Sequence, residues 1–142
     1  MKTLLKIKQK FNEINTTIFD EVIFVVDEKM AVNRLKDNSG FILLVAYPAI
    51  DRIGSQDNPS YEHDISIWSI KKARTGGVTF EQEDNEYNVL QLKLKEFIAA
   101  IEHQVEHGCS FFRKVQFDTF AIDPVYRVFG GFNGWYMNFK ML

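Results

Sequence analysis

The chain of 142 residues is long enough for one domain whose core needs neither a disulfide nor a metal. Its 17 basic and 19 acidic side chains nearly balance, so no field of one sign points to sequence-specific nucleic acid binding or to an anionic membrane surface. An apolar fraction of 46% excludes a disordered chain, and 13 Phe residues exceed what a soluble core of this size needs. We therefore expect a single domain over residues 1–142 that uses some of its aromatic rings at an interface.

Neither a membrane-spanning run nor a targeting signal is recognisable in the sequence. The longest apolar run, Phe41 to Ile50, is interrupted by Tyr47 and Pro48 and has the length of a strand. The first ten residues alternate Lys with Leu and Ile, unlike a signal peptide. Cys109 is the only cysteine, which fits a reducing compartment. These features predict a cytoplasmic protein without a membrane partner.

A first helix is predicted from Thr3 to Asn15, because apolar residues recur there at helical spacing. Its polar side carries four lysines, Lys2, Lys6, Lys8 and Lys10. A solvated helix face explains these charges better than a phosphate-binding face, because no glycine or aromatic pattern accompanies them.

Two strands are predicted next, from Phe19 to Lys29 and from Phe41 to Ala49. Both are apolar on both faces, and the first is rich in β-branched residues, as central strands are. The segment from Arg34 to Gly40 between them has the Asn, Ser and Gly of a turn. We expect the two strands to lie side by side in the middle of a sheet.

The segment from Asp51 to Tyr61 is predicted to be the longest loop, because it is rich in Gly, Ser, Asp, Asn and Pro. It has neither a glycine-rich phosphate cradle nor the spacing of calcium ligands, so Gly54, Asp57 and Pro59 are at most contact residues. A third strand follows from His63 to Ala73, with apolar side chains on both faces: Ile65 and Ile67 on one, Trp68 and Ile70 on the other.

A small basic cluster, Lys71, Lys72 and Arg74, closes this third strand. An acidic run from Glu81 to Glu86 follows it in the chain. Mutual neutralisation is the simplest explanation of both groups of charges.

The clearest element is a long amphipathic helix predicted from Asn85 to His107. Asp84 or Asn85 can cap its first turn, and Gly108 is placed to end it. Its apolar stripe consists of Leu90, Leu94, Phe97, Ile98, Ile101 and Val105. Such a stripe must cover another surface, which we take to be the sheet.

The C-terminal part is predicted to form a strand from Phe111 to Phe120 and then a hairpin from Val125 to Leu142. Asn133-Gly134 is the dipeptide that a type I′ turn requires, so Phe132 is expected opposite Trp135. This register places on the helix-covered face Tyr126, Val128, Phe132, Trp135, Met137, Phe139 and Met141. The other face receives Arg127, Phe129, Tyr136, Asn138 and Lys140.

The resulting order is helix, three strands, helix and two or three strands. We therefore predict an α+β fold, in which two helices pack on one face of a mainly antiparallel sheet in α-β-β-β-α-β-β order.

One motif resembles a catalytic centre, because His103 to His107 matches the H-x-x-E-H pattern of zinc peptidases. At about 100° per residue, however, His103 and His107 fall opposite the apolar stripe and face solvent. No later helix could carry a third zinc ligand. We predict no catalytic or metal-binding residue and no cofactor, and the alternative metal site is His103, Glu106 and His107.

The element order and the closing aromatic strand, Gly134 to Leu142, resemble the tail terminator proteins of long-tailed bacteriophages. The likeness covers essentially the whole chain, through Leu4 to Ile14, Phe19 to Val26, Phe41 to Ala49, Ile65 to Ala73, Leu90 to Val105 and Trp135 to Met141. It implies a structural virion protein without enzymatic activity, made in the host cytoplasm, whose copies form a ring, a hexamer by this resemblance. The implied partners are the tail tube protein and the head–tail connector proteins.

This resemblance places the subunit and partner contacts on the last hairpin and the long loop, at Phe129, Tyr136, Arg127, Lys140, Gly54, Asp57 and Pro59. It would let Lys71, Lys72 and Arg74 line a lumen. Two alternatives stay open. One is a small monomeric enzyme or ligand-binding domain with a pocket between the long helix and the sheet. The other is an adaptor that binds a partner through an exposed sheet edge.

Overall fold

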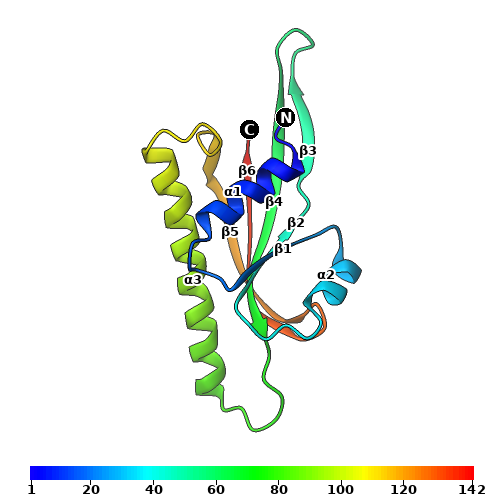
Figure 1. The fold of residues 1–142 in the computed structure, drawn as a ribbon, viewed down its shortest axis with the longest axis vertical. Coiled ribbons are helices and arrows are strands. Elements are labelled where there is room, and N and C mark those ends of the chain that lie inside the picture. Colours follow the sequence, from blue (N-terminus) through cyan, green and yellow to red (C-terminus); the bar gives the residue numbers. More distant parts are fainter.

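The computed structural model describes residues 1–142 as an α+β fold with three helices and six strands. In chain order the elements are α1 (Leu4–Ile14), β1 (Glu21–Val25), α2 (Glu28–Leu35), β2 (Ile42–Ala46), β3 (Ala49–Gly54), β4 (Pro59–Lys72), α3 (Phe80–Glu106), β5 (Val115–Val128) and β6 (Phe132–Met141). Figure 1 shows α3 lying along the sheet, while the β3–β4 hairpin projects beyond the rest of the molecule at one end.

The strands form one sheet in the order β1-β2-β4-β6-β5. Strands β1 and β2 are parallel, as α2 crosses between them, and all the other pairs are antiparallel. Strand β3 lies on the same edge of β4 as β2, because the chain from β2 to β3 is interrupted only at Tyr47-Pro48. At the hairpin end, β3 and β5 are therefore the two edges of the sheet.

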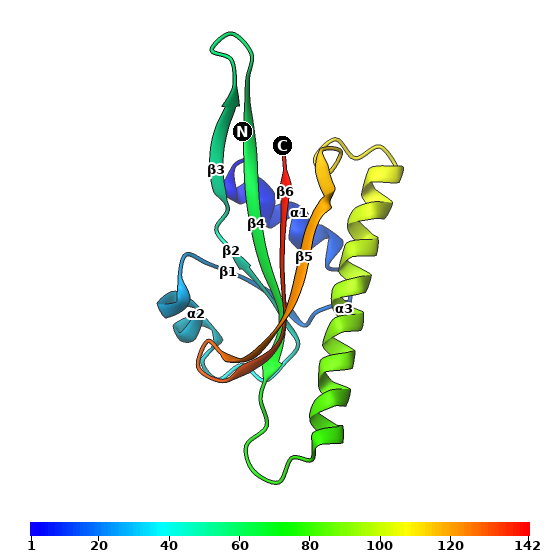
Figure 2. The ribbon, with the colours of Figure 1, turned by 180° about the vertical axis from the view of Figure 1, so that it is seen from behind.

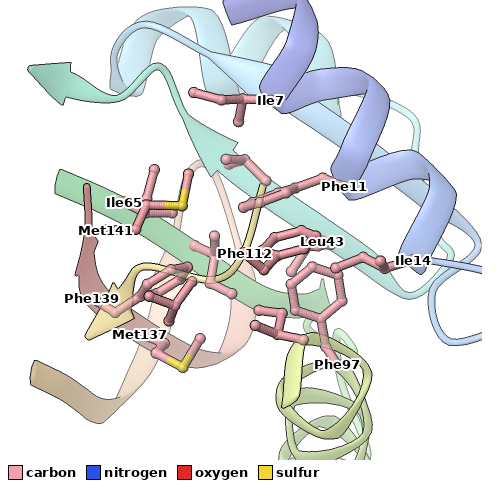
Figure 3. Close-up of a cluster of buried hydrophobic side chains, with 14 of the residues drawn as sticks. Ile7, Phe11, Ile14, Leu43, Ile65, Phe97, Phe112, Met137, Phe139 and Met141 are labelled. Carbon is pink, nitrogen blue, oxygen red and sulfur yellow. The ribbon is translucent and has the colours of Figure 1, made fainter. Parts of the chain in front are cut away.

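The larger core lies between the sheet and the helices α1 and α3 (Figure 3). Phe11 of α1 meets Phe97 of α3 edge to face, with ring centroids 5.6 Å apart. Phe112, which follows α3, stacks on Phe11 at 6.3 Å. Such aromatic pairs contribute about 0.5–1.5 kcal/mol each beyond the burial of their area. The predicted stripes of both helices are confirmed by this core.

A second, smaller core covers the opposite face of the sheet, where the view in Figure 2 shows α2 on the far side from α3. The sequence interpretation missed α2 and placed a strand and a turn there. Asp27 caps this helix by accepting a hydrogen bond from the Met30 N–H at 2.8 Å, and Ala31 and Leu35 are buried one turn apart. The two predicted helices, α1 and α3, do share one face of the sheet, but the predicted count of two helices is wrong, because α2 is a third helix and covers the other face.

The long helix begins five residues earlier than predicted. Thr79 accepts a hydrogen bond from the Gln82 N–H, and the Gln82 side chain accepts one from the Thr79 N–H, which is a capping box. This reciprocal pair makes Thr79 the N-cap in place of Asp84 or Asn85. At the other end Gly108 adopts φ 78°, as predicted for a glycine that ends a helix.

The predicted loop from Asp51 to Tyr61 is instead most of a hairpin. Strand β3 pairs with β4 from Ala49 opposite Asp64 to Gly54 opposite Pro59, and only residues 55–58 turn. Every residue of β3 is exposed. A strand that is solvated on both faces needs no apolar alternation, so its composition is that of a loop.

The last hairpin has a different turn from the predicted one. Strand β5 runs through Pro124 to Val128, the turn lies at Phe129, Gly130 and Gly131, and Val128 pairs with Phe132. Asn133 and Gly134 lie inside β6, which is central in the sheet. A Cβ on Gly134 would lie 1.9 Å from the Ser69 carbonyl oxygen, so this glycine allows close approach of two strands and makes no turn.

The changed register corrects the predicted faces. Phe132 packs in the smaller core on the α2 side, whereas Met137, Phe139 and Met141 lie on the α1 and α3 side as predicted. Of the predicted strand Phe111 to Phe120, the buried Phe111 lies before β5, and Phe117 is 38% exposed. Strands β1 and β2 do lie side by side, but β1 is at an edge of the sheet.

Candidate functional site

The H-x-x-E-H segment lies at the solvent-facing end of α3, and His103, Glu106 and His107 are all exposed. The two imidazole rings stack with centroids 4.0 Å apart, and His107 Nδ1 lies 2.9 Å from the His103 carbonyl oxygen. No group of three His, Cys, Asp or Glu side chains in the structure could hold a metal ion. Both imidazole rings therefore lie in solvent at the C-terminal end of α3, as helix geometry predicted.

The basic cluster at the end of β4 does not act as one unit. Arg74 pairs with Glu86 of α3 at 2.7 Å, in agreement with the predicted neutralisation. The Lys71 ammonium lies 4.8 Å from the centroid of the Phe41 ring, and Lys72 is exposed. A lumen lined by Lys71, Lys72 and Arg74 stays a prediction.

The predicted contact residues on the last hairpin lie largely against their own chain. Phe129 packs edge to face on Trp68 with centroids 5.2 Å apart, and Tyr136 packs on the same indole at 5.0 Å. Lys140 pairs with Glu62 at 3.3 Å, and the Arg127 Nε donates to the Tyr126 hydroxyl. Both aromatic rings are half-buried, so they offer a contact only by their outer edges.

The other predicted contact residues, Gly54, Asp57 and Pro59, do lie together at the tip of the β3–β4 hairpin and are exposed. Gly54 adopts φ 85°, and its missing Cβ would stand 2.6 Å from the Asn58 carbonyl oxygen, so glycine is required to close this turn. Ile53 of β3 lies next to the tip, and Ile50 lies near the other end of the strand, opposite His63. Each is 39% exposed.

Apolar side chains are also exposed on the other edge of the sheet, at β5, across the sheet from β3. Strand β5 exposes Phe117, Ile122 and Tyr126. Between this strand and α3 runs a groove of about 280 Å³, which Leu94, Ile98 and Ile122 make apolar. Sequence reasoning missed this surface because it placed the last turn elsewhere and ended the strand at Phe120.

A pocket of about 320 Å³ lies at the hairpin end of the molecule, where both chain ends, β4 and the segment before β5 meet. Its lining includes Lys2, Tyr61, His63, Arg113 and Lys114. These residues are far apart in the sequence and carry no common motif, so no sequence signal groups them. The mixture of cationic and hydroxyl side chains gives this pocket the chemistry of an anion site.

His63 is the buried histidine of this pocket, with only 1% of its surface exposed. Its Nε2 accepts a hydrogen bond from the Lys2 backbone N–H at 3.1 Å, and its Nδ1 lies 3.3 Å from the Met141 carbonyl oxygen. This pattern assigns a neutral ring with its proton on Nδ1. Burial lowers the pKa of His63, the positive charge of Lys2 lowers it further, and the Met141 carbonyl acts in the opposite direction.

Stability is expected to fall as the pH drops below about 6.5, the ordinary value in the unfolded chain. Because the folded pKa of His63 is lower than the unfolded one, the unfolded state binds more protons in that window. Above about pH 6.5 His63 is neutral in both the folded and the unfolded state, so its full contribution to the free energy of unfolding is present. Urea unfolding between about pH 5 and 8 measures this slope. His63→Gln should flatten it, and a slope in this variant equal to that of the wild type would contradict the assignment.

Comparisons with protein-family models, with curated proteins and with solved structures give no match to this chain. No helix in the structure combines the length and the hydropathy that a membrane crossing requires.

Proposed function

We propose that this protein is a structural subunit whose copies join head to tail into a ring, as in the tail terminator proteins that its element order resembles. In this proposal the ring belongs to a bacteriophage or phage-like particle and connects the tail tube to the head connector. The subunit has no enzymatic role. The observation that carries the proposal is the presence of two different exposed apolar surfaces on opposite edges of one sheet.

The first surface is the hairpin edge, which we define as Ile50 and Ile53, one on each face of the edge strand β3, with the tip that follows Ile53. The second is the groove edge, which we define as the exposed Ile122 of β5 with the half-buried Ile98 and the exposed Ala99 of α3. Surfaces that differ from each other and lie on opposite edges support heterologous contacts, which close into rings when the rotation per subunit allows it.

Pairing of β3 with β3 of a second copy is disfavoured by charge. An antiparallel pair keeps each side chain on its own face, so only residues of equal parity can stand opposite each other. The two registers centred on the strand then place Asp51 opposite Asp51 of the second copy, or Arg52 opposite Arg52 of the second copy. Like charges directly opposite are destabilising, which leaves the hairpin edge for a different surface.

The remaining sheet edges are less suited to backbone pairing. Pro124 removes a donor from β5, and the register between β5 and β6 shifts between Gln116 and Ala121. On β1, Arg34 of α2 donates to the Phe24 carbonyl oxygen. Contacts on the β5 side are therefore made through side chains, which the groove edge supplies.

The test is a mixing experiment followed by light scattering after size exclusion. Wild type is expected to form a discrete oligomer, while Ile50→Asp/Ile53→Asp and Ile122→Asp are each expected to be monomeric, because each loses one of the two surfaces. Mixed in equal amounts, the two variants should form a heterodimer, since one keeps its groove edge and the other its hairpin edge.

Val32→Asp is the matched control, because Val32 is 40% exposed on α2, away from both edges. It should keep the wild-type mass. A wild type that stays monomeric at every concentration would overturn the proposed ring. Variants that keep the wild-type mass, or a mixture that stays monomeric, would overturn the two-edge contact.

A further inference from the structure

The pocket at the hairpin end is lined by several cationic side chains and by no acidic one. Three of its lining side chains are cationic, namely Lys2, Arg113 and Lys114, and none is a carboxylate. None of the three ion pairs of the structure includes Lys2, Arg113 or Lys114. Three positive charges thus surround one cavity in a chain whose formal net charge is −2.

Two of these cationic groups, Lys2 and Lys114, are close enough to repel each other. Burial and then the positive charge of Lys114 lower the pKa of Lys2. The Lys2 ammonium donates to the Leu142 main-chain oxygen and lies 5.6 Å from the centroid of the Phe111 ring. The side chains of Arg113 and Lys114 make no hydrogen bond or ion pair within the chain, so their donors are free for a ligand.

Neutral hydrogen-bonding groups accompany these charges. Ser60, Tyr61 and Ser110 also line the pocket, and a hydroxyl can donate a hydrogen bond to an anionic oxygen. Hydrogen bonds from the main chain fix the segments around the pocket. The Lys2 N–H donates to the His63 ring, and the Leu142 N–H donates to the Lys114 carbonyl at 3.1 Å. Next to Arg113, Phe111 and Phe112 are buried in the main core. The basic side chains therefore project from anchored backbone.

We propose that this pocket binds the phosphate group of a small molecule, either inorganic phosphate or a phosphate monoester. A guanidinium can bind two phosphate oxygens in a fork, and two ammoniums and hydroxyls complete the shell of a dianion. A carboxylate carries half that charge and would leave the cationic excess only partly neutralised. The cavity of about 320 Å³ admits a small ester as well as the free ion. This phosphate site does not depend on the proposed ring, so the test of one does not decide the other.

The test is a titration of the full chain with inorganic phosphate at constant ionic strength, followed by NMR at the His63 ring and the Ser110 amide. A saturable shift of both signals is expected, with a Kd below about 1 mM. Arg113→Gln/Lys114→Gln should weaken binding at least tenfold. Arg113 and Lys114 are exposed, so the variant should fold like the wild type.

Lys36→Gln is the matched control, because Lys36 is an exposed lysine at the end of α2, outside the pocket. It should bind phosphate like the wild type. A parallel titration with phenyl phosphate distinguishes the two sources: tighter binding assigns the site to an ester, and equal or weaker binding assigns it to the free ion. Shifts that do not saturate, or equal binding by the double variant and the wild type, would overturn the proposal.

Discussion

Gly134→Ala is expected to lower the free energy of unfolding by about 4 kcal/mol or more, the range in which a marginal domain fails to fold. A Cβ at this position would lie 1.9 Å from the Ser69 carbonyl oxygen and 3.0 Å from the Ile70 Cα. These atoms are backbone of the neighbouring central strand, so they cannot move aside as a side chain can. Urea denaturation followed by circular dichroism measures the loss.

Gly131→Ala separates this clash from the cost of the backbone conformation. Gly131 also has a positive φ, 119°, but a Cβ there would meet no atom within 4 Å. We expect it to cost only about 1–3 kcal/mol, the strain of a non-glycine residue in that region. Equal losses in the two variants would show that the close approach of β4 and β6 contributes nothing.

Phe97→Ala is expected to destabilise the protein by about 3–5 kcal/mol, the range for removing a phenyl ring from a packed core. Phe97 is fully buried and meets Phe11 at 5.6 Å and Phe19 at 6.2 Å between ring centroids. Its removal leaves a cavity between α1, α3 and the sheet. Equilibrium unfolding in guanidinium chloride measures the change.

Phe80→Ala is the control on the same helix, since Phe80 lies in the first turn of α3 and is 91% exposed. The same chemical change there should stay within about 0.5 kcal/mol of the wild type. A small loss for Phe97→Ala, similar to that of the control, would contradict the packing of α3 on α1.

Periodicity predicted the elements that bury one stripe or face against the core. The apolar spacing of α3 identified Leu90, Leu94, Phe97 and Ile101, all of which are buried. The alternation along β4 separated Ile65 and Ile67 from Ile70 in the same way, and the two sets lie in different cores. In both cases burial against a single partner surface dictates the pattern.

Local turn signals were misleading where distant contacts decide the structure. Asn133-Gly134 has the composition of a hairpin turn, yet the Asn133 side chain accepts the Arg127 N–H at 2.8 Å and Gly134 admits a neighbouring strand. The position of β6 between β4 and β5 sets this requirement, and no local pattern encodes it. Likewise, the eight residues of α2 are too few for a clear period, although its Asp27 cap is a local signal.

The candidate sites also differ in whether a local pattern or contacts between distant segments determine them. The exposure of His103 and His107 followed from helix geometry alone and is confirmed. The phosphate pocket joins Lys2, His63 and Arg113 across most of the chain, so only the folded topology assembles it. At the β3–β4 hairpin, the exposed tip residues Gly54, Asp57 and Pro59 were named from the sequence, and their role as contacts stays a prediction; strand β3 was not predicted.

The place of β6 in the sheet also governs when the chain can fold during synthesis. This strand is the last element in the sequence, yet it pairs with β4 from His63 to Lys72 on one side and with β5 on the other. A ribosome-bound chain that has emerged only to Gly131 therefore carries two long strands without their shared partner. Such contacts between distant segments slow folding and expose apolar edges meanwhile. The nascent protein thus depends on the ten residues of β6 to join the single strand β5 to the sheet formed by β1 to β4.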